Sequence, residues 1–411
     1  MRARLTATLA CVLAAGGPAA CGGDGERGGG DVAGDTLTVY ASQPLEGRLG
    51  NQARDVVRAE RLALAQAGGR AGRWRVRLVA LNDADARTGD WDPGLVSANA
   101  RRAAQDDTTI AYLGELDTGA SAVSIPVLNE TGILAISPTD TPAGFTRTRG
   151  VAPGEPEKYY PTGERTFGRL VPPDDIQAQA LVSAMQDRRV KRIFLVNDRG
   201  FYGRSLSLVV QRRALAAGIE TVKGRGADFD DIGSPAALTR EITATAADAV
   251  VYTGAPRAGV DAFFRALHAA DPKLAIFGPG ALVTPAFAAL LGPAGDRTTL
   301  TSPVLPLQAQ PAAARAFARD YRARYGSDPL PEAAYAYEAM GVLLASIRAA
   351  GDDGNDRGAV IEAFFATKDR QSVLGRYSID AAGDTTAQVY AAWGIRDGRL
   401  IFAGVLDPLG A

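Results

Sequence analysis

Residues 112–141 read YLGELDTGASAVSIPVLNETGILAISPTDT, and this stretch decides the fold. The apolar run around Ile110 to Leu113 predicts a strand, and a second run, Ile133 to Ser137, predicts another. Between them, a helix is expected to open at Thr118 and to end before Gly132. A strand, a helix and a second strand in this order are typical of a parallel sheet with helices on its faces.

Hydroxyl side chains gather at the ends of these two strands. Thr118 and Ser121 lie where the helix opens, and Thr139 and Thr141 follow the second strand. The carboxyl ends of parallel strands meet at one edge of a sheet, where helix N-terminal N–H groups and loop hydroxyls favour an anionic group. We therefore expect a small-molecule carboxylate at this edge. Helix capping and turn formation are the alternative roles for each residue taken singly.

Strand and helix signals alternate along the rest of the chain, which predicts further parallel sheets. The first part holds expected strands at 36–41 and 74–81 and expected helices at 51–67 and 94–105. A second copy of this plan holds expected helices at 175–187, 202–217 and 235–246 and expected strands at 192–197, 220–224 and 249–252. With 411 residues and 46% hydrophobic content, the chain is long enough to bury two cores.

Four stretches of the chain resemble one family when they are taken in order. They are residues 79–93 (VALNDADARTGDWDP), 112–141, 193–206 (IFLVNDRGFYGRSL) and 248–271 (DAVVYTGAPRAGVDAFFRALHAAD). Their order and spacing resemble the type I periplasmic solute-binding proteins of branched-chain amino acid ABC transporters, the Leu/Ile/Val-binding proteins. The resemblance implies an α/β fold of two doubly wound parallel-sheet lobes, joined by a hinge in which the chain crosses three times.

The chain path of this family implies a division into four parts. They are a signal peptide (1–20), a Gly-rich tether (21–35), lobe one (36–168 with 301–366) and lobe two (169–300 with 367–411). On this path, helices near 311–325 and 332–349 rejoin lobe one, whereas strands near Tyr377 and 389–395 rejoin lobe two.

The resemblance also implies where a ligand binds. In this family, a hydroxyl residue after the third strand and the Ser-Pro-x-x-Thr loop receive the ligand carboxylate, and these positions match Thr118, Thr139 and Thr141. The tyrosine of an Asp-x-x-x-Tyr-Gly motif folds over the ligand from lobe two, and here Asp198, Tyr202 and Gly203 match it.

The chain departs from the family at the ammonium end of the ligand. The family's acidic residue is replaced by Gly280, so either Asp140, Asp117 or Glu115 pairs with an ammonium or the ligand has none. Arg257 is a candidate for a second anionic group, with a solvated helix start as the alternative.

An insertion, residues 150–165, precedes the first crossing. Its tyrosines, Tyr159 and Tyr160, are expected to pack within a surface loop, with a cap over the ligand site as the alternative.

The first residues resemble a bacterial lipoprotein signal. Arg2 and Arg4 precede an apolar run from Leu5 to Ala15, and Pro18-Ala19-Ala20-Cys21 follows it. The resemblance implies that Cys21 becomes a lipidated N-terminus, and the Gly-rich residues after it predict a flexible tether. Ordinary secretion is the alternative, because Pro18 stands where lipoprotein signals usually have leucine.

Composition argues against several chemistries. The chain has one His, and its two Cys both lie within residues 1–21, so Ser-His-Asp, Cys-His and multi-His zinc sites are excluded. The acidic stretches 83–92 and 352–356 lack the spacing of a calcium loop and are expected to be turns. We expect no cofactor, no metal and no enzymatic activity, with a carboxylate-dependent hydrolase as a remote alternative. A net charge of −1 argues against nucleic acid as a partner.

Together these features predict an exported receptor, lipid-anchored on the outer face of the bacterial cytoplasmic membrane or periplasmic. It would capture a small carboxylate-bearing ligand, an amino acid or a related amide or acid, between its lobes and deliver it to an ABC permease. The expected partners are that ligand, the transmembrane subunits of the permease and the membrane through the lipid anchor alone, and we expect a monomer. A ligand sensor that feeds a signalling partner is the alternative.

Overall fold

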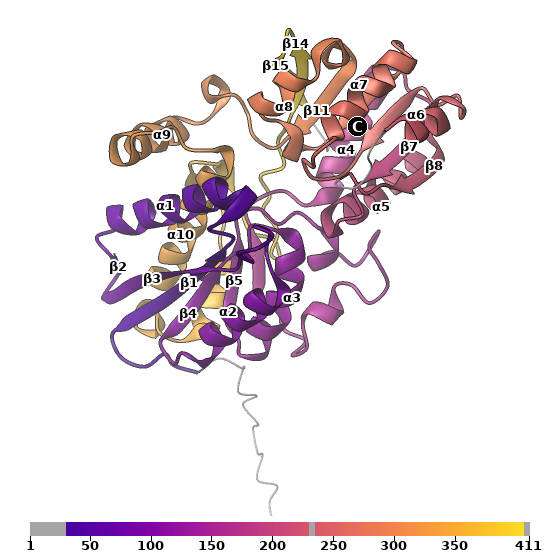
Figure 1. Ribbon diagram of the computed structural model, residues 1–411. Coiled ribbons are helices and arrows are strands. Elements are labelled where there is room, and N and C mark those ends of the chain that lie inside the picture. Colours follow the sequence, from indigo (N-terminus) through magenta and orange to yellow (C-terminus); the bar gives the residue numbers. More distant parts are fainter. Residues whose placement is uncertain (1–29, 230–234, 407–411) are drawn as a thin grey trace, which may run out of the picture.

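The computed structural model describes residues 30–229 and 235–406. These residues form two lobes, each built around one large β-sheet (Figure 1). The predicted signal peptide and Cys21 lie outside the described residues.

Lobe one contains a six-stranded sheet in the order β2-β3-β1-β4-β5-β6. Its strands are β1 (Thr36–Gln43), β2 (Arg70–Ala71), β3 (Trp74–Asn82), β4 (Thr109–Leu113), β5 (Leu134–Ser137) and β6 (Phe167–Arg169). All neighbouring strands are parallel except β2 and β3. The carboxyl ends of β1, β3, β4 and β5 therefore lie at one edge of the sheet.

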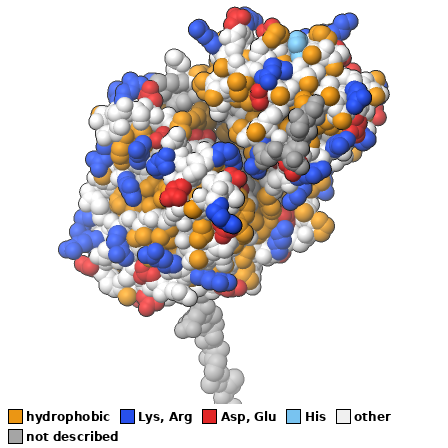
Figure 2. All heavy atoms as spheres, viewed as in Figure 1, with side chains coloured by type: hydrophobic (Ala, Val, Ile, Leu, Met, Phe, Trp, Pro, Cys, Tyr) orange, Lys and Arg blue, Asp and Glu red, His pale blue; other side chains and the backbone are white. Residues whose placement is uncertain are grey.

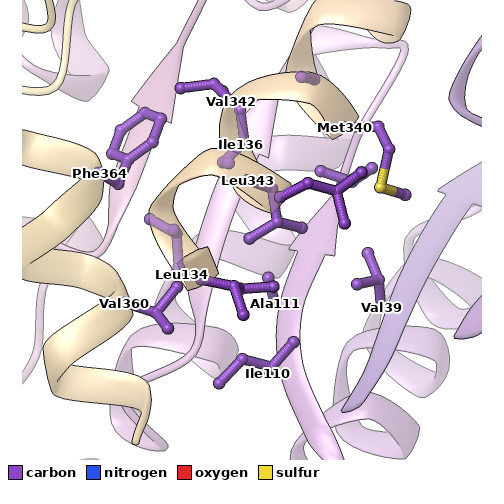
Figure 3. Close-up of a cluster of buried hydrophobic side chains, with 14 of the residues drawn as sticks. Val39, Ile110, Ala111, Leu134, Ile136, Met340, Val342, Leu343, Val360 and Phe364 are labelled. Atoms are coloured by element: carbon purple, nitrogen blue, oxygen red, sulfur yellow. The ribbon is translucent and has the colours of Figure 1, made fainter. Parts of the chain in front are cut away.

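Helices cover both faces of this sheet because successive side chains of a strand point to opposite faces. Val39 packs with Met340 and Leu343 on one face (Figure 3). Ala41 belongs to the same cluster, whereas Tyr40 packs on the other face. The first face is covered by α10 (Pro331–Ala349) and α11 (Arg357–Phe365), and the second by α2 (Pro93–Gln105) and α3 (Thr118–Glu130). Two more helices, α1 (Gly50–Gln66) and α9 (Ala312–Tyr325), pack beside α10.

Lobe two contains a seven-stranded sheet in the order β15-β14-β11-β10-β9-β7-β8. Its strands are β7 (Arg192–Asn197), β8 (Glu220–Gly226), β9 (Ala249–Tyr252), β10 (Ala275–Gly278), β11 (Thr298–Ser302), β14 (Tyr390–Arg396) and β15 (Arg399–Leu406). One face packs on α4 (Asp174–Asp187) and α5 (Phe201–Ala216), and the other on α6 (Ala236–Thr243), α7 (Val260–Ala270) and α8 (Pro285–Leu290). The last two strands run antiparallel to their neighbours.

The chain passes between the two lobes three times, after β6, after β11 and before β14 (Figure 1). The third crossing comes later than the sequence predicts. The strand at Tyr377 is β13 (Gly375–Tyr377), which pairs only with β12 (Arg370–Ser372). Tyr377 is buried in the core of lobe one and donates a hydrogen bond to Glu338 Oε1 of α10 at 2.7 Å. The prediction that this strand joins lobe two is therefore wrong, and residues 380–389 form the third crossing.

A buried ion pair joins the first crossing to the third. Arg169, the last residue of β6, and Asp384 are both fully buried, and Arg169 Nε donates to Asp384 Oδ1 at 2.6 Å. Arg169 Nη1 also donates to the carbonyl of Pro142 at 2.7 Å, and Arg147 pairs with Asp384 at 2.8 Å. These contacts fix two of the three crossing segments to each other.

The insertion and the start of the chain both pack against lobe one. Tyr159 and Tyr160 are buried with Phe145 and Phe167, which agrees with the prediction of packed tyrosines. Val32 is also buried in lobe one, so the predicted tether ends before residue 35. The chain enters lobe one beside Asn355, where the N–H of Val32 donates to the Asn355 carbonyl at 2.8 Å.

Acidic and basic side chains are interspersed over both lobes on the visible face of the molecule (Figure 2). None of the helices within the described residues is long and apolar enough to cross a membrane.

Candidate ligand-binding site

The predicted site residues lie in loops and helix starts that follow the strands β4, β5, β7 and β9 of the two lobes. We call this region the lobe junction; it consists of the loops after β4, β5, β7, β9 and β10 and the first turn of α4. Asp174 of α4 donates its N–H to the carbonyl of Thr141 at 2.6 Å. In the same region, Phe201 of α5 stacks on Phe145 with ring centroids 6.1 Å apart.

Several of the hydroxyls expected to hold a carboxylate are already engaged inside lobe one. Ser121 is fully buried, donates to Asp140 Oδ2 and accepts from the N–H of Glu115 at 3.1 Å. The Thr139 hydroxyl donates to the carbonyl of Glu115 at 3.0 Å. Burial raises the pKa of Asp140 to about 7, against the opposing effect of Ser121. Ser121 and Asp140 therefore hold the loop after β5 to α3, and the prediction that they contact a ligand directly is not supported.

Glu115 is likewise held within lobe one. The Tyr112 hydroxyl donates to Glu115 Oε1 at 2.7 Å, and the Ser42 hydroxyl donates to Asp83 Oδ2 at 2.9 Å. Burial, and then the neighbouring Asp83, raise the pKa of Glu115 well above its usual value, while burial raises the pKa of Asp83 to about 6. Two adjacent buried carboxyls of this kind favour sharing a proton.

The start of α3 leaves Thr118 at the lobe junction. Asp117 caps this helix by accepting from the N–H of Gly119 at 2.8 Å, and Thr118 is 7% exposed. The ring of Trp91 lies against Gly119, where a Cβ would come within 2.5 Å of a ring carbon. Burial raises the pKa of Asp117, and Arg257 of lobe two and Arg48 oppose this shift. Arg257 therefore acts on lobe one from across the junction.

Lobe two contributes the predicted turn between β7 and α5. Asp198 Oδ1 accepts from the N–H of Gly200 at 3.1 Å, and Asp198 Oδ2 accepts from the N–H of Ala255 at 3.0 Å. Arg257 Nε lies 3.5 Å from Asp198 Oδ2, with the Arg257 side chain 25% exposed. The Arg257 guanidinium is thus held at the junction and is not a solvated helix start.

Tyr202 and the loop at Gly280 are linked through one side chain that sequence reasoning missed. Gln177 Nε2 donates to the Tyr202 hydroxyl at 2.8 Å, and Gln177 Oε1 accepts from the N–H of Gly280 at 3.3 Å. Gln177 lies one turn after Asp174 on α4, so both side chains project from the same face of that helix.

Asp174 is the second residue that sequence reasoning missed. It is fully buried, and no hydrogen bond of good geometry from the described residues reaches either of its carboxylate oxygens. Burial raises the pKa of Asp174 to about 7, and the Thr141 hydroxyl and Arg169 oppose that shift. Burial and then Asp174 raise the pKa of Tyr202 well above its usual range. The hydroxyl of Tyr390, another group near Asp174, is also buried without a hydrogen-bond partner.

No group of three or more His, Cys, Asp or Glu side chains in the described parts of the chain is arranged to hold a metal ion. In the acidic stretch after β3, Asp85 Oδ1 accepts from the N–H of Arg87 at 2.6 Å, and Asp92 accepts from the N–H of Leu95 at 2.9 Å. These contacts form a turn and the N-cap of α2.

Comparison with known proteins assigns the family. The model of the periplasmic binding protein family matches residues 36–399. The chain belongs to this family. This periplasmic binding protein is 29% identical over 291 residues to the Leu/Ile/Val-binding protein BraC3 of Rhizobium johnstonii, a match that covers 69% of the chain and 73% of the relative. It is 26% identical over 292 residues to Leu/Ile/Val-binding protein homolog 3 of Brucella melitensis, covering 70% and 73%.

Solved structures agree on the fold of this periplasmic binding protein. The leucine-binding protein LivK of Thermotoga maritima superposes with a TM-score of 0.75 at 21% identity, covering 90% of the chain and 99% of LivK. A solute-binding protein of an ABC transporter from R. palustris, solved with benzoate, has a TM-score of 0.73 at 21% identity and covers 90% and 96%. The predicted type I fold and the resemblance to the branched-chain amino acid transporter type are confirmed. These relatives are solute-binding proteins, and the family implies an extracytoplasmic location.

Proposed function

We propose that this periplasmic binding protein captures an amino acid or a closely related small carboxylate between its lobes and presents it to an ABC permease. Family membership and the polar groups at the lobe junction support this function. We also propose that the protein is lipid-anchored through Cys21 and acts as a monomer. It is a binding protein in this account and carries out no reaction on its ligand.

The observation that carries the ligand class is the buried carboxylate of Asp174, to which the described residues supply no hydrogen bond of good geometry although Thr141 and Arg169 lie near it. A buried carboxylate with so few partners is costly to ionise, and a ligand ammonium would supply hydrogen bonds and charge. The family's acidic position is Gly280 here, and Gln177 joins the Gly280 loop to the face of α4 that carries Asp174. An acid on α4 would thus replace the acid lost from the loop after β10.

The ligand carboxylate would lie at the opposite end of the junction. Thr118 stands at the first turn of α3, where Asp117 already accepts from the N–H groups of the following residues, so the Thr118 hydroxyl and its own N–H would be the contacts from this helix. Arg257, which Asp198 holds in place, would add a positive charge from lobe two. Thr139 and Thr141 would shape the wall of lobe one, and the ring of Tyr202 would cover the ligand from lobe two.

Such a ligand would touch both lobes and would therefore favour the closed arrangement. A ligand shifts a conformational equilibrium by the difference between its affinities for the two states. Thr118 belongs to lobe one, whereas Asp174, Tyr202 and Arg257 belong to lobe two. The permease would then recognise the closed form.

The test compares ligand pairs that differ only in the ammonium group. Leucine, isoleucine and valine, their deaminated acids, and benzoate are titrated by calorimetry against the protein and against Asp174→Asn. We expect leucine, isoleucine and valine to bind. The D174N substitution should weaken their binding roughly tenfold or more and leave the affinity for the deaminated acids unchanged. Asp187→Asn, the same change at the exposed end of α4, is the control and should have no effect.

The pH dependence gives a second readout of the same group. Because Asp174 must be ionised to pair with an ammonium, amino acid affinity should fall roughly tenfold per unit as the pH drops below about 7. Equal affinity for leucine and its deaminated acid in wild type and D174N would refute the role of Asp174. Binding of benzoate alone would place the ligand among aromatic acids.

A further inference from the structure

A second cavity lies at the hinge, beside the lobe junction: Pro172, two residues before Asp174, and Pro303, next to Gly280, line it. It has a volume of about 560 Å³ and none of Thr118, Asp174 or Tyr202 lines it. All three crossing segments contribute to its wall, through Leu170, Leu305 and Val389. Lobe one closes the rest of the wall with α9, α10 and the β12–β13 hairpin.

The charged groups of this wall already have partners at its rim. Arg322 and Asp328 form an ion pair with their side chains 64% and 66% exposed. Arg376 pairs with Asp369 at 2.9 Å, with the side chains 63% and 67% exposed. A charged ligand would gain little from ions that are paired and hydrated, and it would lose its own hydration on entering.

The inner wall is largely apolar. Leu170, Leu305, Phe317, Leu374 and Val389 supply hydrophobic surface. The side-chain amide of Gln310 donates to the carbonyl of Leu305 at 2.7 Å. The volume falls within the range of about 300–1,000 Å³ that is usual for small-molecule sites. A small, uncharged, apolar molecule fits this chemistry best.

Because of the position of the cavity, a bound molecule would influence the relative arrangement of the two lobes. Rotation of one lobe against the other must move residues 170–173, 303–306 and 380–389, and members of each segment line the cavity. A molecule that fits one shape of the cavity favours the lobe arrangement that has this shape. Binding here would therefore be coupled to ligand capture at the lobe junction.

We propose that the hinge cavity is a second binding site, which takes a small, uncharged, apolar molecule and restrains the crossing segments. This proposal does not depend on the identity of the ligand at the lobe junction.

The first test uses the uncharged fluorescent probe N-phenyl-1-naphthylamine. We expect saturable binding with one site per chain. Ala318→Phe on α9 fills the cavity and should weaken probe binding at least tenfold. Ala313→Phe, at an exposed position of the same helix outside the cavity wall, should leave probe binding unchanged. The absence of saturable binding, or an equal loss in both variants, would overturn the proposal.

A second pair of variants avoids any packing change. Val389→Asp places a charge on the third crossing at a side chain that is 45% exposed, and Val405→Asp does the same on β15, at 58% exposure and outside the cavity. Of these two variants, only V389D should weaken binding of the probe. Tyr202→Ala should leave probe binding unchanged, and a loss confined to Y202A would mean that the probe binds at the lobe junction, which contradicts the proposal.

The restraint is tested by hydrogen exchange. Saturating probe should slow amide exchange at Leu170 and Val171 and in residues 380–389 of the wild type and leave exchange in A318F unchanged. Bound probe without slower exchange in these segments would refute the coupling to the hinge.

Discussion

Arg169 and Asp384 show how much one residue pair contributes to the hinge. Both side chains are fully buried, and they join segments that are far apart in the sequence. Breaking a buried pair costs roughly 3–5 kcal/mol, and removing Arg169 would leave buried Asp384 with Arg147 as its remaining cation, so the lower end of this range applies. We therefore expect Arg169→Gln to lower the free energy of unfolding by about this amount, measured by urea denaturation.

The matched control for R169Q is an ion pair at the surface. Arg376→Gln removes the cation of a pair whose side chains are both more than 60% exposed, so a change below about 1 kcal/mol is expected. Similar losses in the two variants would show that Arg169 has no special role. Partial recovery in a double variant, Arg169→Met with Asp384→Leu, would assign the cost to the orphaned charge.

Buried carboxyls should make the unliganded protein less stable as the pH rises. Asp140 and Asp174 have an ordinary pKa of 3.8 that burial raises to about 7. Between these values the folded state binds more protons than the unfolded state, so the free energy of unfolding falls with increasing pH. We expect the thermal midpoint to be higher at pH 5 than at pH 8.

The variant Asp140→Asn isolates one of these carboxyls. Its amide oxygen still accepts from Ser121, but it has no charge to bury, so the decline between pH 5 and pH 8 should become smaller. A thermal midpoint that rises from pH 5 to pH 8 would contradict the raised pKa of Asp140. So would the same decline with pH in D140N as in the wild type.

At the scale of elements, the turn between β7 and α5 depends on a residue without a side chain. A Cβ at Gly203 would collide with the carboxylate of Asp198, which accepts from the N–H groups of Gly200 and Ala255. Gly203→Ala should therefore lower the thermal midpoint and displace Tyr202, the residue before it. Differential scanning calorimetry and ligand titration measure the two effects.

Gly224→Ala is the control for this substitution. Gly224 lies in β8 of the same lobe, and a Cβ there would meet only Leu195 Cβ at an ordinary distance of 4.0 Å. The thermal midpoint of G224A should differ little from that of the wild type. A G203A protein as stable and as competent in binding as G224A would show that the turn tolerates a side chain.

The elements themselves were predictable where periodicity and turn residues agree. The strand 249–252 is predicted to the residue, and α1, α2 and α9 begin and end within one residue of the expected limits. The hairpin at Tyr377 was misplaced because a short strand carries no signal for its partner. Its packing in the core of lobe one and its contact with Glu338, on a helix distant in sequence, assign it to lobe one.

The site was harder to predict than the elements for a physical reason. A serine or threonine near a strand end can serve a ligand or a neighbouring loop, and the choice depends on which acceptors the fold brings close. Ser121 meets Asp140 and Glu115, which occupy its hydroxyl. Asp174 was missed because an aspartate in the first turn of a helix is usually explained by the helix dipole alone.

At the scale of the whole molecule, the proposed function requires that both lobes contact one ligand. Tyr202 belongs to lobe two and is half-buried at the junction. Tyr202→Ala should weaken ligand binding at least tenfold without a change in fold, measured by calorimetry and circular dichroism. Small-angle scattering should show ligand-induced compaction in the wild type. Unchanged affinity in Y202A would place the site elsewhere.

The three crossings have a consequence for how the chain assembles during export. Residues 36–169 supply every strand of the six-stranded sheet of lobe one, but the helix that covers Val39 and Ala41 begins only at Pro331. The parallel strands of lobe two, β7 to β11, are contiguous in the chain with the helices that cover them. Since contacts between distant segments form late, lobe two is expected to be the first folded body to emerge. Until the helix that begins at Pro331 is available, one apolar face of the sheet of lobe one would stay uncovered. This face is therefore the surface that a holding chaperone has to protect.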